Sequence, residues 1–175
     1  MMEKKYQLVA WTENVTDNEN VKLKMLPSLY YDMQEPYFRE ITRCQQEEDR
    51  HNGHISPDLA RRFVKVYEQN AEFEFLTGHY GDGIRWLCMA ALYCVWEDDT
   101  NWTYWDTDLG HYSYFCGELR HEFTRLCEKV ISLVKRYHRE DILLEDKPGQ
   151  MMKLYLEHTK ESRDLEAYTN NGQTV

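Results

Sequence analysis

The stretch Gly78–Ala90 constrains the fold most, because it places a tight turn between two segments with helical periodicity. Before it, Ser56 is a good N-cap and Pro57 suits the first position of a helix. Apolar side chains then recur every three or four residues as far as Leu76, and again over residues 80–96. Two helices joined by such a short turn become antiparallel neighbours. The sequence therefore predicts a helical hairpin in the middle of the chain.

Helical periodicity also covers most of the remaining chain. We expect a helix over residues 36–50 with Pro36 as its first residue, a long helix over 112–138, and a last helix that starts at Asp146 or Pro148. The 8 Gly and 4 Pro are too few for an all-β fold with many turns. The predicted fold class is all-α, with about five helices in antiparallel hairpins around one core.

A chain of 175 residues corresponds to one domain, or to one domain with a short extension. We interpret residues 1–22 as an N-terminal extension of unassigned structure and residues 23–169 as a single α-helical domain. Residues 170–175 are expected to form a disordered tail.

Six residues of the central hairpin match a known alternation of small and bulky side chains. They are Gly78, Tyr80, Gly83, Ile84, Leu87 and Ala90. In this order and spacing they resemble the turn and second helix of a tetratricopeptide repeat, and the resemblance covers about residues 64–97. It implies stacked helical hairpins, in which small residues let helices approach closely, and a groove that receives a protein or peptide.

Four positions depart from the tetratricopeptide pattern. Asn70 stands where the family has Leu, Glu74 where it has Tyr, and Gly83 where it has Ala. Val95 lies near the place where a Pro usually closes the repeat. The alternative fold is a generic antiparallel or orthogonal helical bundle, in which the same six motif residues are simply core.

Charge and composition restrict the partners. The net charge is -10, so the phosphate backbone of a nucleic acid would repel the chain, and a basic protein or peptide is the favoured partner. No apolar run approaches the roughly 20 residues of a membrane span, and the first residues lack a signal-peptide pattern. We therefore expect a cytoplasmic protein without membrane association, with its cysteines reduced and buried.

Residues 97–112 form an acidic, aromatic connector between two predicted helices. Five of its side chains could form a platform for a sugar or a cationic group: Trp102, Tyr104, Trp105, Asp106 and Asp108. Alternatively, the aromatic rings hold the connector over the helices while the acids stay in solvent. The first interpretation gives a second candidate function, a small-ligand-binding protein.

Two Glu-x-x-His pairs, Glu48 with His51 and Glu118 with His121, have the spacing of metal ligands in carboxylate-bridged helical bundles. Chance alone supplies about one such match in a chain of this composition, and solvated helix faces explain both pairs equally well. A metal-dependent enzyme is the third candidate function.

The sequence contains neither a nucleophile motif nor a phosphate-binding glycine loop, and we expect no cofactor. The favoured function is a non-catalytic adaptor that binds a protein or peptide. A homodimer through the predicted helix over 112–138 is a further option.

Overall fold

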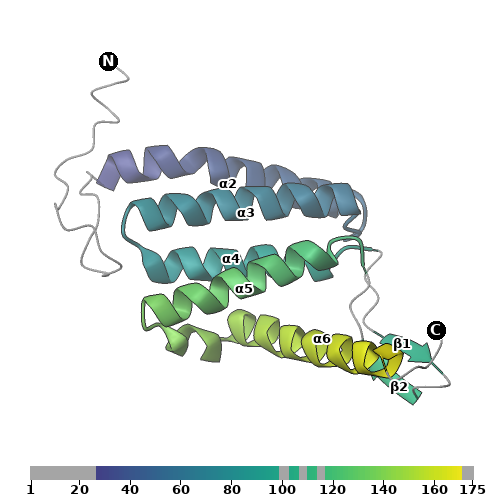
Figure 1. Cartoon of the computed structure of the whole chain (residues 1–175). Helices are drawn as coiled ribbons and strands as arrows, with labels where there is room; N and C mark the ends of the chain where they lie inside the picture. The colour runs from purple at the N-terminus through teal and green to yellow at the C-terminus, as the bar shows by residue number, and fades with distance from the viewer. Residues whose placement is uncertain (1–26, 99–102, 107–109, 114–116, 171–175) are drawn as a thin grey trace.

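The computed structural model describes residues 27–98, 103–106, 110–113 and 117–170. Five α-helices pack against each other in these ranges, and consecutive helices run in alternating directions (Figure 1). They are α2 (Pro27–Arg50), α3 (Pro57–Leu76), α4 (Tyr80–Val95), α5 (Arg120–Arg136) and α6 (Asp146–Asn170). A short 3-10 helix, η1 (Glu140–Leu144), leads into α6. The predicted all-α class, with antiparallel hairpins, is confirmed.

Helix α4 lies at the centre of the packing and contacts α3, α5 and α6. Twelve of its 16 residues are buried. Ala90 and Ala91 are fully buried, and such small side chains let neighbouring helices come close. Phe63 of α3 stacks on Tyr93 of α4 with ring centroids 4.0 Å apart, which joins the two helices of the hairpin at the core.

The ends of α3 follow the sequence signals. The Ser56 hydroxyl accepts a hydrogen bond from the Leu59 amide at 3.2 Å, as an N-cap does. At the other end Gly78 has a φ of +82°, which a residue with a side chain rarely adopts. This conformation lets the His79 amide donate to the Glu74 carbonyl at 2.8 Å, and so closes the helix in a Schellman motif.

Helix α5 ends in the same motif, but without a glycine. The Arg139 amide donates to the Val134 carbonyl at 2.8 Å, while His138 occupies the left-handed position with a φ of +55°. A side chain at this position strains the backbone.

His138→Gly is therefore expected to raise the free energy of unfolding by about 0.5–1 kcal/mol, measured by urea denaturation. Glu128→Gly, at an exposed position in the middle of α5, is the control and should lower that free energy by about 1 kcal/mol. An equal decrease in the free energy of unfolding in both variants would contradict the left-handed conformation of His138.

Two predicted helix boundaries are wrong. Pro36 is not the first residue of a helix but lies inside α2, which begins nine residues earlier. Its side chain is exposed, and the buried face of α2 continues past it from Gln34 to Ile41. Burial of this face outweighs the helical hydrogen bond that proline cannot donate.

The long helix expected over residues 112–138 begins only at Arg120. Before it, β1 (Thr103–Asp106) and β2 (Gly110–Ser113) form an antiparallel pair in which Tyr104 lies opposite Tyr112. Aromatic residues and threonine favour extended backbone, which explains why this part of the connector pairs as strands. Figure 1 shows the two strands beside the end of α6.

The predicted extension over residues 1–22 and the last five residues of the chain lie outside the described ranges. Within those ranges no helix has both the length and the apolar character needed to cross a membrane.

Candidate functional site

The six motif residues of the hairpin have mainly a packing role. Each of them is buried: Gly78, Tyr80, Gly83, Ile84, Leu87 and Ala90. A Cβ atom on Gly83 would lie 2.8 Å from the ring of Phe75, which is closer than real Cβ contacts. The small residue at this position is therefore a requirement of the close contact between α3 and α4.

The residues proposed for a ligand platform are only partly covered by the structure. Tyr104, Trp105 and Asp106 belong to β1, and Trp105 lies opposite His111 of β2. Trp102 and Asp108 lie outside the described residues. Ligand binding by the connector therefore stays a prediction.

The two Glu-x-x-His pairs do not come together. Glu118 accepts a hydrogen bond from Arg61 at 2.6 Å, as part of an ion pair between α3 and the residues just before α5. Nowhere in the described ranges do three or more His, Cys, Asp or Glu side chains lie close enough to hold a metal. Glu48, His51 and His121 therefore share no ligand cluster with Glu118.

Four cysteines are buried free thiols, as predicted: Cys44, Cys88, Cys94 and Cys127. Burial raises the pKa of Cys44 and of Cys88 to about 12. A thiol that stays protonated is a poor nucleophile, so these cysteines serve as core side chains.

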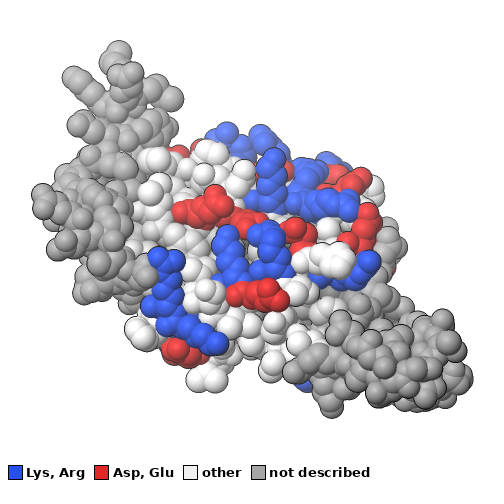
Figure 2. Space-filling view, in the orientation of Figure 1, with Lys and Arg blue, Asp and Glu red and all other residues white. Residues whose placement is uncertain are grey.

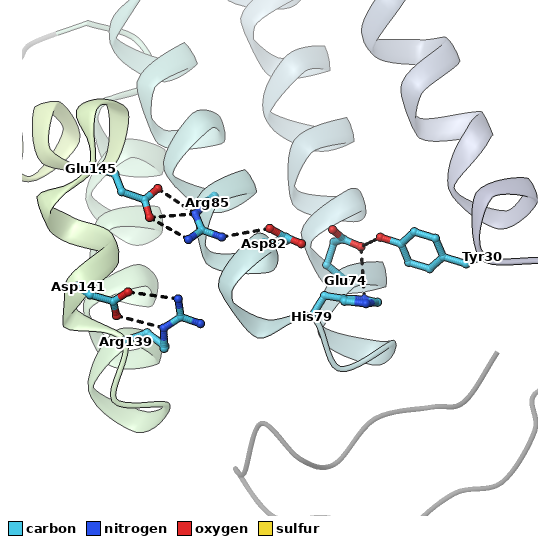
Figure 3. A network of polar contacts seen from close by, with 8 residues as sticks. All are labelled: Tyr30, Glu74, His79, Asp82, Arg85, Arg139, Asp141 and Glu145. Carbon is cyan, nitrogen blue, oxygen red and sulfur yellow. Dashed lines mark hydrogen bonds and ion pairs between the residues drawn. The ribbon is translucent and has the colours of Figure 1, made fainter. Parts of the chain in front are cut away.

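A line of polar side chains lies where α2 meets the central hairpin. We call it the polar seam; its members are Tyr30, Gln34, Asn70, Glu74 and His79. The Gln34 amide donates to Asn70 Oδ1 at 3.0 Å, and the Tyr30 hydroxyl donates to Glu74. His79 Nδ1 lies 3.9 Å from Glu74 Oε1 (Figure 3). Asn70 is fully buried and Glu74 is 3% exposed, so the α3 side of the seam is internal, whereas His79 at its end is exposed.

Burial raises the pKa of the Glu74 carboxyl, and the nearby Asp82 carboxylate raises it further. Hydrogen bonds from Tyr30 and from the Trp86 indole act in the opposite direction. Arg85 lies close by in Figure 3, but its guanidinium pairs with Glu145 at 2.8 Å and with Asp82 at 3.1 Å. The carboxyl of Glu74 is thus held largely by neutral donors.

Besides the buried Glu74 carboxyl, Asn70 also makes the polar seam costly to bury. Its Nδ2 atom is buried without a hydrogen-bond partner among the described residues. An unsatisfied buried donor costs about 1–3 kcal/mol. Polar groups that are expensive to bury occur often at functional sites, which makes the polar seam a candidate site.

The sequence marked only half of the seam. Asn70 and Glu74 were visible as polar departures from the tetratricopeptide pattern, but their partners lie 36 and 44 residues away along the chain. One sequence feature could have indicated these partners, namely that the polar residues on both helices have the same spacing. Tyr30 and Gln34 are four residues apart on α2, as Asn70 and Glu74 are on α3.

The outer face of α2 carries two exposed aromatic side chains. Tyr31 is 67% exposed and Phe38 is 41% exposed. The Phe38 ring meets Trp86 of α4 edge-on, with centroids 5.9 Å apart. A hollow in this face is lined by α2 residues alone: Glu35, Phe38, Arg39, Thr42, Arg43 and Gln46.

Acidic and basic side chains intermingle on the face formed by α2, α3 and α5 (Figure 2). The pairs link neighbouring helices, and Glu68 of α3 is the most enclosed of these groups. It accepts two hydrogen bonds from Arg125, at 2.8 and 2.9 Å, and one from Lys129 at 3.1 Å. The Arg125 hydrogen bonds lower the pKa of the Glu68 carboxyl.

The ion pairs of Glu68 stabilise the folded protein. Their contribution to the free energy of unfolding is fully present above the unfolded pKa of about 4.5, and it is lost as the pH falls through the lowered pKa of the folded state. Glu68→Gln should reduce the free energy of unfolding at neutral pH by about 1 kcal/mol and flatten its decline in acid. The control is Glu72→Gln, at an exposed position of the same helix. Identical acid-unfolding curves for both variants would contradict a role for the Glu68 pairs.

The chain matches no protein-family model, no curated protein and no solved structure. The resemblance to a tetratricopeptide repeat therefore rests on the hairpin residues themselves.

Proposed function

We propose that this chain is a non-catalytic adaptor that binds a protein or peptide through the outer face of α2. The observation that supports this most is the pair of exposed aromatic rings: Phe38, which lines the hollow on that face, and Tyr31, seven residues before it on α2. Aromatic side chains are enriched among the residues that dominate protein interfaces. Helix α2 packs on α3 and touches α4 through Phe38, and no other described helix covers its opposite side.

The packing of the central hairpin fits a tetratricopeptide-like arrangement. Gly83 lies against Phe75, and small Ala residues lie where α4 meets its neighbours. In such proteins, stacked hairpins form extended surfaces for other proteins. The net charge of -10 favours a partner with a basic surface.

Affinity capture tests this function. The tagged full-length chain is incubated with a lysate of the source organism, and the bound proteins are identified by mass spectrometry against a tag-only control. We expect a stoichiometric protein partner whose recovery falls as salt is added, because salt screens the attraction of opposite charges.

Recovery of no stoichiometric protein would contradict the adaptor function. In that case, quenching of tryptophan fluorescence by a panel of sugars and amines would test the ligand-binding connector. A response there would favour the alternative of a small-ligand-binding protein.

A further inference from the structure

We propose that Glu74 is a proton-sensitive latch: its protonation tightens the docking of the N-terminal half of α2, residues 27–36, on the α3–α4 hairpin, and its ionisation loosens it. The latch is a property of the chain itself and goes beyond the adaptor function.

The two halves of α2 are held in different ways. The N-terminal half meets α3 through the polar seam, where Tyr30 and Gln34 donate hydrogen bonds, and through the Tyr30 ring, 5.3 Å from Phe73. Leu29 is buried as well, but no described residue of this half belongs to the hydrophobic core cluster. The C-terminal half is anchored by the buried side chains of Ile41 and Cys44. Arg62 of α3 adds ion pairs with Glu40 and Glu47 on this same half.

Pro36 separates the two halves. It cannot donate the helical hydrogen bond that other residues of α2 supply, so the helix is weakest at that point. Segments with few apolar contacts open locally at lower cost than the core does. If residues 27–36 alone separated from the α3–α4 hairpin, water would reach Glu74 while the other helices stayed folded.

The groups that face Glu74 come from every element packed around it. Helix α2 contributes the Tyr30 hydroxyl, the turn after α3 contributes His79, and α4 contributes Trp86 and Asp82. Asp82 is negative and repels an ionised Glu74. His79 acts in the opposite direction and favours the ionised carboxylate.

The sign of the effect follows from burial. In the closed arrangement burial raises the pKa of Glu74 above its ordinary value of 4.5. Closed docking is therefore strongest below about pH 4.5 and weakens as the pH rises through the raised value. Opening lets water solvate the carboxylate, which is why ionisation favours the open arrangement.

Hydrogen exchange measured by mass spectrometry on the intact chain tests the latch. Protection of residues 27–36 is compared with that of residues 123–134 in α5, after correction for the intrinsic pH dependence of exchange. As the pH rises from about 4.5 to about 7, we expect protection of the α2 segment to fall several-fold relative to that of α5. A ratio that does not change with pH would overturn the proposal, and this comparison needs no variant to fold.

Glu74→Gln removes the titrating group and keeps an oxygen that accepts from Tyr30. In this variant the ratio should stay constant with pH, at the high value of the wild type in acid. Glu72→Gln is the matched control, because Glu72 lies on the same helix at an exposed position outside the seam. It should keep the wild-type pH dependence of the ratio. The same fall in Glu74→Gln as in the wild type would overturn the assignment to Glu74.

Discussion

Phe63→Ala is expected to lower the free energy of unfolding by about 3–5 kcal/mol, as measured by urea denaturation. Phe63 is fully buried, and its ring stacks on Tyr93 at 4.0 Å and on Tyr67 at 6.2 Å. Truncation leaves a cavity between α3 and α4 and removes a large apolar area from the core.

Phe38→Ala is the matched control, because it removes the same atoms from an exposed position on α2. It should cost about 1 kcal/mol or less. A loss below about 1 kcal/mol for Phe63→Ala would mean that α3 and α4 do not pack through this ring.

Gly83→Ala is expected to destabilise the protein by up to about 2 kcal/mol. Alanine improves helix propensity by about 1 kcal/mol, but its Cβ would lie 2.8 Å from the Phe75 ring. That ring lies beside the stacked pair Tyr80 and Tyr137, with centroids 6.3 and 6.5 Å away, and this pair limits its movement on one side. Overpacking of this kind typically costs 1–3 kcal/mol.

Gly81→Ala is the control that separates the gain in helix propensity from the steric clash. A Cβ on Gly81 would meet the guanidinium of Arg139 at 2.9 Å, at the far end of a flexible side chain that can move. The variant should be neutral or stabilised by up to about 1 kcal/mol. Stabilisation of Gly83→Ala by a similar amount would contradict the close contact between Gly83 and Phe75.

The sequence alone predicted correctly those helix ends and turns that are specified by neighbouring residues. The N-cap at Ser56, the glycine turn at Gly78 and the start of α6 at Asp146 all appear where predicted. Each depends on backbone chemistry within a few residues, which sequence patterns record directly.

The wrong boundaries depend on contacts that local patterns do not record. Pro36 predicted a helix start, but the buried face of α2 against α3 keeps the helix continuous through it. The apolar spacing that begins at Tyr112 predicted helix, whereas pairing with Tyr104 places this residue in a strand. An apolar residue followed by a helical stripe is ambiguous until its strand partner is known.

The candidate site could be predicted from the sequence only in part, for the same reason. Asn70 and Glu74 occupy the buried face of α3 in the sequence pattern, so their polarity already required partners. That those partners are Gln34 and Tyr30 depends on how α2 docks, which no local signal specified. The two Glu-x-x-His pairs show the converse, because their local spacing matched a metal motif that the fold does not assemble.

The central claim is that a partner binds the outer face of α2, and quantitative capture of that partner by surface variants tests it most directly. Tyr31→Asp and Phe38→Asp alter that face, whereas Leu144→Asp alters a more exposed apolar residue, 89% exposed, on η1. Circular dichroism first establishes that all three variants are folded. The account predicts that both α2 variants retain about tenfold less partner than the wild type, while Leu144→Asp retains the same amount. Undiminished capture by both α2 variants would contradict the claim.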